Sequence, residues 1–194
     1  MATGSVACRV HRPAIRIPLA EFFPAPDGYQ VRTAGHEDLT CLAALERRAA
    51  TRIPSDRIDP TSTVAADALA SGQRSGWLFC ATPSGAGDAV VGFLLTEPRG
   101  PELHLIELSV DPEHGGRGLG RALLTAAERR ARQGAFNALT LTTFADLPFN
   151  APFYERLGFQ RLPHDDPSLA SELAAERAAG LTQRVAMRKR LEVS

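Results

Sequence analysis

The fold is decided at residues 110–124, which read Val-Asp-Pro-Glu-His-Gly-Gly-Arg-Gly-Leu-Gly-Arg-Ala-Leu-Leu. An apolar run ends at Val110, four glycines follow within six residues, and an amphipathic pattern begins at Leu119. Glycines let the backbone come close to a ligand, and the first turn of a helix has unpaired N–H donors at the positive end of its dipole. The stretch therefore predicts a strand, an anion-binding loop and a helix, with a phosphate as the expected ligand.

The spacing of the glycines argues against the two commonest nucleotide loops. A dinucleotide fingerprint that starts at Gly116 needs a third glycine where Arg121 stands. A Walker A loop that starts at Gly115 needs lysine at Arg121 and then serine or threonine, where Ala122 stands. A nucleotide-phosphate module is therefore disfavoured, whereas an ordinary glycine-rich turn between a strand and a helix stays possible.

The loop resembles the pyrophosphate loop of the GCN5-related N-acetyltransferases (GNAT), whose pattern is Gln/Arg-x-x-Gly-x-Gly/Ala at the start of a helix. The sequence departs from this pattern at its first position, where Gly115 replaces the usual Gln or Arg, so one side-chain contact is missing while the backbone donors and Arg117 remain. The resemblance implies that this segment binds acetyl-CoA through Gly115, Gly116, Arg117, Gly118, Leu119, Gly120 and Arg121.

A second resemblance covers residues 149–159, Phe-Asn-Ala-Pro-Phe-Tyr-Glu-Arg-Leu-Gly-Phe, which are similar to the Asn-x-x-x-(Phe/Leu)-Tyr-x-x-x-Gly-Phe segment of the same family. The part from Phe153 to Phe159 fits the pattern, whereas Asn150 stands one position closer to Phe153 than the pattern has it. It implies that Asn150 and Phe153 lie against the CoA arm and that the Tyr154 hydroxyl protonates the departing thiolate. A structural interpretation of the same residues stays open. Asn150 can cap the short helix that Pro152 opens, and Tyr154 can be a core aromatic.

Composition and charge limit the classes of protein to which the chain can belong. With 194 residues we expect an N-terminal arm at 1–28, rich in proline, and one acyltransferase domain at 29–194. Lys plus Arg equals Asp plus Glu at 22 each, which argues against nucleic acid and membrane partners. Cys8, Cys41 and Cys80 are widely spaced, so we expect free thiols, no metal and a cytoplasmic location.

The remaining periodicities predict the other elements of this domain. The expected strands are 29–34, 77–82, 89–95, 102–110, 138–144 and 185–191. The expected helices are 39–50, 63–71 ending at Gly72, 119–133 ending at Gly134, a short one between Pro152 and Gly158, and 169–179. The family resemblance, from about Tyr29 to Leu191, implies an α/β (α+β) fold with a mixed, twisted sheet of six or seven strands and helices on both faces.

In the expected strand before the glycine loop, successive side chains should point to alternate faces of the sheet. Strict alternation places Leu103, Leu105, Glu107 and Ser109 on one face and His104, Ile106 and Leu108 on the other, unless a bulge intervenes. Strand 138–144 follows by a helix-length crossover, so we expect it to lie beside this strand and parallel to it.

The family resemblance implies a reaction with acetyl-CoA as co-substrate. Its pantetheine amides would pair with the backbone of Leu108, Ser109 and Val110, where two parallel strands separate. An acceptor amine must lose a proton before it attacks the thioester, and Glu107 is the leading candidate for the base. His104, Glu46 and water are alternatives, and Glu107 can instead be an ordinary strand carboxylate. Thr142 stands where some relatives place a glutamate.

The sequence thus predicts an N-acetyltransferase that moves an acetyl group to a primary amine of a small molecule or peptide. The alternative is a catalytically inactive acyl-CoA-binding sensor or structural relative. The acceptor loops do not separate a small amine from a peptide. The apolar arm and the terminal strand make a homodimer conceivable.

Overall fold

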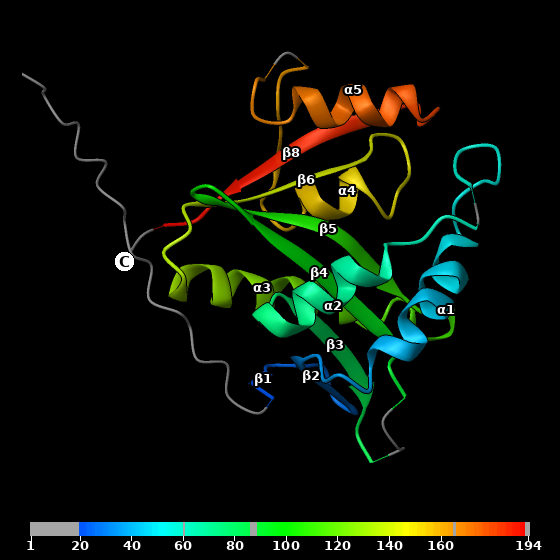
Figure 1. The fold of residues 1–194 in the computed structure, drawn as a ribbon, viewed down its shortest axis with the longest axis vertical. Helices are drawn as coiled ribbons and strands as arrows, with labels where there is room; N and C mark the ends of the chain where they lie inside the picture. The colour runs from blue at the N-terminus through cyan, green and yellow to red at the C-terminus, as the bar shows by residue number, and fades with distance from the viewer. Residues whose placement is uncertain (1–19, 60, 86–88, 165, 193–194) are drawn as a thin grey trace, which may run out of the picture.

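Eight strands form one mixed sheet in the part of the chain that the computed structural model describes, residues 20–59, 61–85, 89–164 and 166–192 (Figure 1). The strands are β1 (Phe22–Phe23), β2 (Tyr29–Thr33), β3 (Leu78–Pro83), β4 (Gly92–Arg99), β5 (Glu102–Val110), β6 (Ala138–Phe144), β7 (Gln160–Arg161) and β8 (Arg184–Arg190). Their order is β1-β2-β3-β4-β5-β6-β8-β7. The sheet has one strand more than the upper expectation of seven, and both edge strands are only two residues long.

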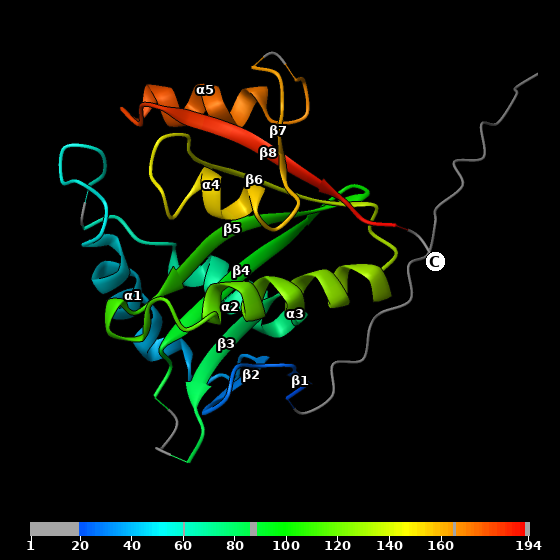
Figure 2. The same cartoon turned by 180° about the vertical axis from the view of Figure 1, so that it is seen from behind.

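Helices cover both faces of the sheet, as expected (Figures 1 and 2). The helices are α1 (Leu39–Ala50), α2 (Ala66–Ser75), α3 (Leu119–Gln133), α4 (Ala151–Glu155) and α5 (Ala170–Ala178), with a 3-10 turn at Pro112–His114. One core forms between the sheet and α1 and α2, and includes Leu42, Leu69, Phe93 and Leu95. A second core on the opposite face contains most of the apolar residues of α3, together with Ala151 of α4.

Helix α2 differs from its expected bounds. It continues through Gly72 and ends at Gly76, which takes the left-handed conformation at φ 73°. Gly72 serves packing instead of termination, because a Cβ at this position would lie 2.3 Å from Leu95 Cδ1 on β4. The expectation that Gly72 ends the helix is therefore wrong, and the glycine lets α2 lie close to the sheet.

Part of the N-terminal arm belongs to the sheet. Phe22 and Phe23 pair with Arg32 and Val31 of β2, and the Phe23 ring meets Phe79 edge-on at 5.6 Å between centroids. Burial of Phe23 fixes the end of the arm on the core that also contains α3. The apolar arm residues Ile15, Ile17 and Leu19, and also Cys8, lie outside the described residues.

Strands β5 and β6 are parallel, as the crossover predicts, but they pair only briefly. Pairing runs from Glu102↔Ala138 to His104↔Thr140. Beyond these residues β5 stays paired with β4 up to Val110, whereas β6 stays paired with β8 up to Phe144. The two parallel strands therefore separate in the middle of the sheet.

A β-bulge lies next to this separation. Leu95 of β4 pairs with Glu107 and Thr96 pairs with Leu105, so Ile106 has no partner on β4. The extra residue reverses the alternation, which places Glu107 on the same face as His104. The assignment from strict alternation, with these residues on opposite faces, is therefore wrong. Because a bulge also bends its strand, it accounts for the point at which β5 leaves β6.

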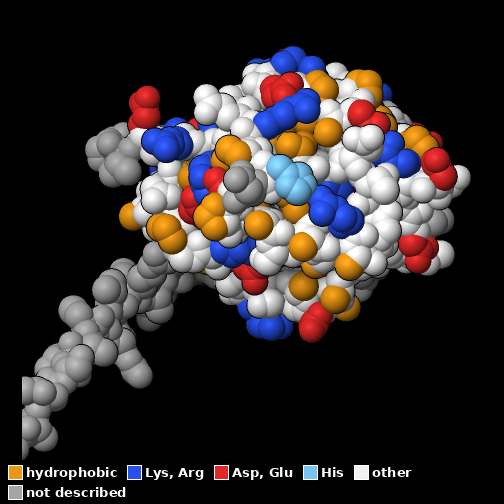
Figure 3. All heavy atoms as spheres, turned by 90° about the horizontal axis from the view of Figure 1, so that it is seen from above, with side chains coloured by type: hydrophobic (Ala, Val, Ile, Leu, Met, Phe, Trp, Pro, Cys, Tyr) orange, Lys and Arg blue, Asp and Glu red, His pale blue; other side chains and the backbone are white. Residues whose placement is uncertain are grey.

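The surface carries charges of both signs. Figure 3, which looks down from above the view of Figure 1, shows basic, acidic and apolar side chains interspersed over this face. This distribution agrees with the formal net charge of zero.

Candidate active site

The glycine loop presents open backbone at the start of α3. Asp111 accepts a hydrogen bond from the Glu113 N–H at 3.1 Å and so shapes the turn before the glycines. Gly116 (φ 73°) and Gly118 (φ 82°) take left-handed conformations that favour glycine. Gly118 is the N-cap of α3 and has no side chain to bond the N–H groups of the first turn. These donors are therefore available to an anion.

The side chains of the loop differ in exposure. Arg117 and Arg121 are exposed, and one Arg117 nitrogen lies 3.4 Å from the Glu113 carbonyl. Leu119 is 1% exposed and belongs to the core, so only its backbone faces the loop. A Cβ at Gly116 would meet no atom within 4 Å. The backbone cradle formed by residues 115–120 is thus open at Gly116, and the charged side chains of Arg117 and Arg121 lie at its edge.

Helix α4 lies against the first turn of α3. A Cβ on Gly120 would lie 3.3 Å from Phe153 Cζ and 3.9 Å from Leu108 Cδ2, so this glycine makes room for the aromatic ring. The structure therefore brings Leu108, Gly120 and Phe153 together, although they come from a strand and two helices. An acyl-CoA arm fits this arrangement, because apolar side chains here adjoin the open donors of α3.

The separation of β5 from β6 exposes backbone groups on β5. The Asp111 N–H donates to the Val91 carbonyl at 2.9 Å, which makes this a hydrogen-bonded pair of the antiparallel ladder. By alternation, Ser109 also bonds across to β4, while the N–H and C=O groups of Leu108 and Val110 point toward the gap. The Ser109 side chain is buried and donates to Glu107 Oε1 at 2.6 Å.

Asn150 does not cap α4 with its side chain. Its Nδ2 donates to Thr143 Oγ1 at 2.9 Å, and its backbone carbonyl accepts from the N–H groups of Phe153 and Tyr154. The Oδ1 atom is buried and has no hydrogen-bond partner among the described residues. A buried acceptor without a donor is costly, so this oxygen is suited to receive an N–H from a ligand.

The charge of Glu107 acts on the phenol of Tyr154. Burial raises the pKa of Glu107 above its ordinary value, although the Ser109 hydrogen bond and the charge of Arg184 oppose this shift. Burial, and then the negative charge of Glu107, raise the pKa of the Tyr154 phenol. Tyr154 therefore keeps its proton at neutral pH and can donate it, and Glu107 is a stronger base than an exposed carboxylate.

The Tyr154 ring is held by its aromatic neighbours. It meets Phe153 at 5.2 Å and Phe159 at 5.5 Å between centroids, both in edge-on geometry. Within the described part of the chain no hydrogen bond to its hydroxyl is found, so the O–H is not committed to a structural partner.

A second carboxylate adjoins Glu107 from α1. Burial raises the pKa of Glu46 to about 7, and the charge of Glu107 adds to this effect. Both carboxylate oxygens lie within 3.1 Å of the Val64 N–H, which precedes α2. Glu46 is only 8% exposed, and its contacts with Val64 join α1 to the segment before α2.

His104 is ill placed to act as a base. It is 1% exposed, with Nδ1 3.0 Å from Thr140 Oγ1 and Nε2 3.1 Å from Glu172 Oε1 of α5. Both ring nitrogens are occupied by these contacts, which fasten α5 to the sheet.

Two residues missed by the sequence reasoning, Arg184 and Glu176, lie beside this site. Arg184 of β8 binds Glu176 of α5 at 2.7 and 3.0 Å, and Glu176 Oε1 accepts from Thr142 Oγ1 at 2.6 Å. A carboxylate thus reaches Thr142 from α5 and is neutralised by Arg184. Arg57 frames the same region by contact with Phe144. Thr142 lies 34 residues from Glu176, and Arg184 and Glu176 lie on different elements, so no local motif could have revealed the cluster.

The loop between α1 and α2 reaches across to the loop after β6. Arg57 donates to both Asp146 oxygens at 3.0 and 3.1 Å and to the Thr182 carbonyl at 3.3 Å. The guanidinium groups of Arg57 and Arg184 lie 5.0 and 4.6 Å from the centre of the Phe144 ring. These contacts cover the carboxyl end of β6.

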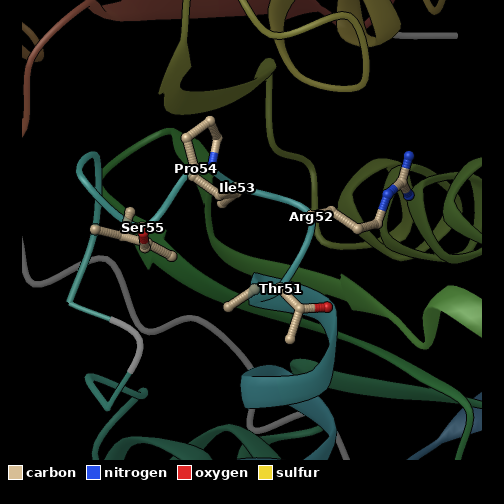
Figure 4. Close-up of a pocket in the computed structure, with 7 residues that line it drawn as sticks. Thr51, Arg52, Ile53, Pro54 and Ser55 are labelled. Atoms are coloured by element: carbon tan, nitrogen blue, oxygen red, sulfur yellow. The ribbon is translucent and has the colours of Figure 1, made fainter.

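The hollow in Figure 4 belongs to the same α1–α2 loop. It is lined by Ala50, Thr51, Arg52, Ile53, Pro54, Ser55 and Ile58, and neither Glu107 nor Tyr154 contributes to it. The hollow is therefore separate from the candidate residues Glu107 and Tyr154.

The profile of the acetyltransferase (GNAT) family matches residues 42–159, which include the glycine loop, Glu107 and Tyr154. The chain belongs to this family. The expected fold is confirmed as well, because solved GNAT structures superpose on this acetyltransferase over most of its length.

Three solved structures illustrate the likeness. The ribosomal-protein-S18-alanine N-acetyltransferase of Escherichia coli is 21% identical, with a TM-score of 0.62 over 86% of this chain and 96% of that chain. The PaiA N-acetyltransferase of Thermoplasma acidophilum, in complex with coenzyme A, is 16% identical, with a TM-score of 0.61 over 84% of this chain and 99% of that chain. The N-acetylglutamate synthase of Neisseria gonorrhoeae, bound to coenzyme A and N-acetyl-glutamate, is 17% identical, with a TM-score of 0.64 over 84% of this chain but 35% of that chain.

The described residues were also compared with the requirements of a metal site and of a membrane span. Within the described ranges no three or more His, Cys, Asp or Glu side chains form a group able to hold a metal ion. None of the helices described has the length and hydrophobicity needed to cross a membrane.

Proposed function

We propose that this acetyltransferase moves an acetyl group from acetyl-CoA to a primary amine, on a small molecule or a peptide, in a ternary complex. The observation that carries the proposal is the position of Glu107 on β5 just after the strand leaves β6, with the Tyr154 phenol within reach of its charge. A base and an acid at one opening between strands are what transfer to an amine requires.

Acetyl-CoA would be held by the groups that the fold leaves open. The N–H groups from Gly116 to Gly120 would receive its pyrophosphate, and the backbone of Leu108 and Val110 its pantetheine amides. Phe153 and the unpaired Oδ1 of Asn150 would contact the same arm. Acetyl-CoA supplies the reactive thioester; the chain supplies orientation and proton transfer.

Proton transfer is assigned to two side chains. Glu107, directly or through one water, takes the proton from the ammonium group of the acceptor, so that the nitrogen has a lone pair for the thioester carbon. As the C–N bond forms and the C–S bond breaks, Tyr154 gives its proton to the thiolate, and the second proton that leaves the nitrogen restores the Tyr154 phenol through solvent. Glu46 is the alternative base, because it is also buried beside Glu107.

The acceptor would approach from the face that carries α1, α2 and Glu107. Glu107, joined by Glu46 as the pH rises above about 7, gives this side negative charge, which favours a cationic amine. Relatives of the fold are named for acceptors as different as a ribosomal-protein alanine and glutamate, so the fold leaves both small and peptide acceptors within the proposal. The unpaired thiols of Cys41 and Cys80 support a reducing, cytoplasmic location.

The test is ligand-dependent melting with acetyl-CoA, CoA, ATP and NAD, on the natural chain and on Gly118→Glu. We expect selective stabilisation by the CoA compounds and its loss in the variant, because the new side chain at φ 82° would enter the cradle. Thiol release with a panel of amines then measures transfer. Selective stabilisation by ATP or NAD would overturn the proposal, and CoA binding without transfer to any amine would favour the inactive sensor.

A further inference from the structure

Gly115 occupies the position at which the resembling loop has Gln or Arg, yet its backbone does not require glycine. Its φ of −64° and ψ of 156° are extended values that any residue adopts. A Cβ would lie 3.1 Å from the Pro112 carbonyl, a close but not prohibitive contact. The missing side chain therefore leaves a gap in the loop that the local conformation does not explain.

A guanidinium from another element lies at this gap. Nη1 of Arg52, in the α1–α2 loop, is 3.9 Å from the position that a Cβ on Gly115 would take. The Arg52 guanidinium carbon also lies 4.4 Å from the centre of the Phe149 ring, one residue before Asn150. Figure 4 shows the Arg52 side chain pointing away from Ile53, Pro54 and Ser55.

The end of α1 and the start of the glycine loop run side by side. Arg48 Nε donates to Asp111 Oδ2 at 2.7 Å, which fixes the two segments together. Four residues further on in each segment, Arg52 meets Gly115. The position of Arg52 therefore follows from a fixed register between α1 and the loop.

The donors of Arg52 are free for a ligand. The side chain is exposed, and within the described residues its N–H groups have no hydrogen bond and no ion pair. Its ring contact with Phe149 uses the face of the guanidinium and leaves the edge, which carries the N–H groups, unoccupied. An arginine edge suits phosphate oxygens, which it can bind with two parallel hydrogen bonds.

We propose that Arg52 supplies, from the α1–α2 loop, the side-chain contact to the acetyl-CoA pyrophosphate that Gly115 cannot make. The inference rests on the proposed function, since it needs a CoA ligand in the glycine loop. It also explains the glycine: a long side chain at position 115 would occupy the space that the Arg52 guanidinium enters.

Calorimetric titration tests the contact directly and does not depend on turnover. The ligands are CoA and 3′-dephospho-CoA, which share the pyrophosphate, and the proteins are the natural chain, Arg52→Ala, Arg52→Gln and the control Arg74→Ala. Arg74 is an exposed arginine on α2 with no partner among the described residues. We expect both Arg52 variants to weaken both ligands about tenfold and Arg74→Ala to change neither more than twofold.

Relocating the cation gives the sharper result. In the Arg52→Ala background, Gly115→Arg should recover most of the lost affinity, while Gly115→Ala, the control for the added Cβ, should not. The melting temperature without ligand shows whether each variant is folded.

Three results would overturn the inference. They are an affinity of Arg52→Ala for CoA within twofold of the natural chain, a loss seen with CoA but absent with 3′-dephospho-CoA, and equal rescue by Gly115→Ala and Gly115→Arg. Failure of the proposed function is distinct, because then the natural chain itself would not bind CoA.

Discussion

The carboxylates of Glu46 and Glu107 lie close enough, although they belong to α1 and β5, for the charge of one to raise the pKa of the other. Burial is the larger cause, and together they bring the pKa of Glu46 to about 7 from its ordinary value near 4.5. Two acids thus share a site in which a proton is held more tightly than in water. Both the stability and the activity of the protein should therefore depend on pH.

The stability of the natural chain should fall as the pH rises from about 4.5 to about 7. The folded state binds the Glu46 proton more tightly than the unfolded state, so unfolding releases a proton in this window and becomes easier at higher pH. Glu46→Gln retains an oxygen acceptor for the Val64 N–H but cannot ionise. At pH 8 we expect it to be more stable than the natural chain by up to about 3 kcal/mol, with no advantage at pH 4.5.

Urea unfolding at the two pH values measures this difference. Glu192→Gln, at an exposed position, is the control and should change stability by less than about 0.5 kcal/mol at either pH. An advantage of Glu46→Gln that is equal at pH 4.5 and pH 8 would contradict the assigned shift.

The activity should show the opposite trend with pH, because a base must be deprotonated. We expect kcat/KM to increase as the pH rises through the raised pKa values of Glu46 and Glu107. Because the two groups interact, the apparent pKa values in the profile belong to the pair and not to either residue alone. Glu107→Gln should lower kcat at pH 8 by about a hundredfold and leave the CoA dissociation constant unchanged.

Glu46→Gln distinguishes the two candidate bases. If Glu107 is the base, this variant stays active, because it leaves the Glu107 carboxylate in place. A hundredfold loss in Glu46→Gln with normal turnover in Glu107→Gln would assign the base to Glu46 instead.

Tyr154→Phe should lower kcat by about a hundredfold and change the CoA dissociation constant by less than twofold, since it removes only the acid. Steady-state kinetics and calorimetry measure the two quantities. Tyr29→Phe is the matched control, because it removes the other tyrosine hydroxyl of the chain, which lies 2.9 Å from His114 Nδ1. Unchanged turnover in Tyr154→Phe would make Tyr154 a packing residue.

The contact of Arg57 with Asp146 should affect the acceptor more than the cofactor. Arg57→Ala separates the α1–α2 loop from the loop after β6, so we expect a higher KM for the amine and an unchanged CoA dissociation constant. The double variant Arg57→Asp, Asp146→Arg restores the ion pair and should recover the KM. If the double variant is no better than Arg57→Ala, the pair does not order the acceptor side.

Much of the fold could be predicted from local patterns in the sequence. Strand 138–144 and helix 119–133 have the bounds expected from their periodicity, and the parallel arrangement follows from the crossover length. Turn glycines and strand alternation act over a few residues, so a single sequence displays them.

Which residues meet at the candidate site could not be predicted from the sequence and became clear only from the folded structure. Ile106 is the bulged residue, but any residue of an alternating strand looks the same until its partner strand is known, so the face of Glu107 could not be assigned. Arg184, Glu176 and Thr142 meet only because β6, α5 and β8 pack together. The position of Arg52 beside Gly115 could likewise not be predicted, since it depends on how α1 lies beside the loop.

The bulge also determines how β5 can tolerate changes in its length. Strand β5 has one residue more than β4 between the pairs Leu95↔Glu107 and Thr96↔Leu105. Deletion of Ile106 would therefore leave Glu107 and Ser109 on their present face but remove the bend that parts β5 from β6. Deletion of Leu108 would instead move Ser109 and Val110 each to the face of the sheet opposite to its present one. Two deletions only two positions apart would thus damage the enzyme differently, one by closing the opening and the other by reversing its lining.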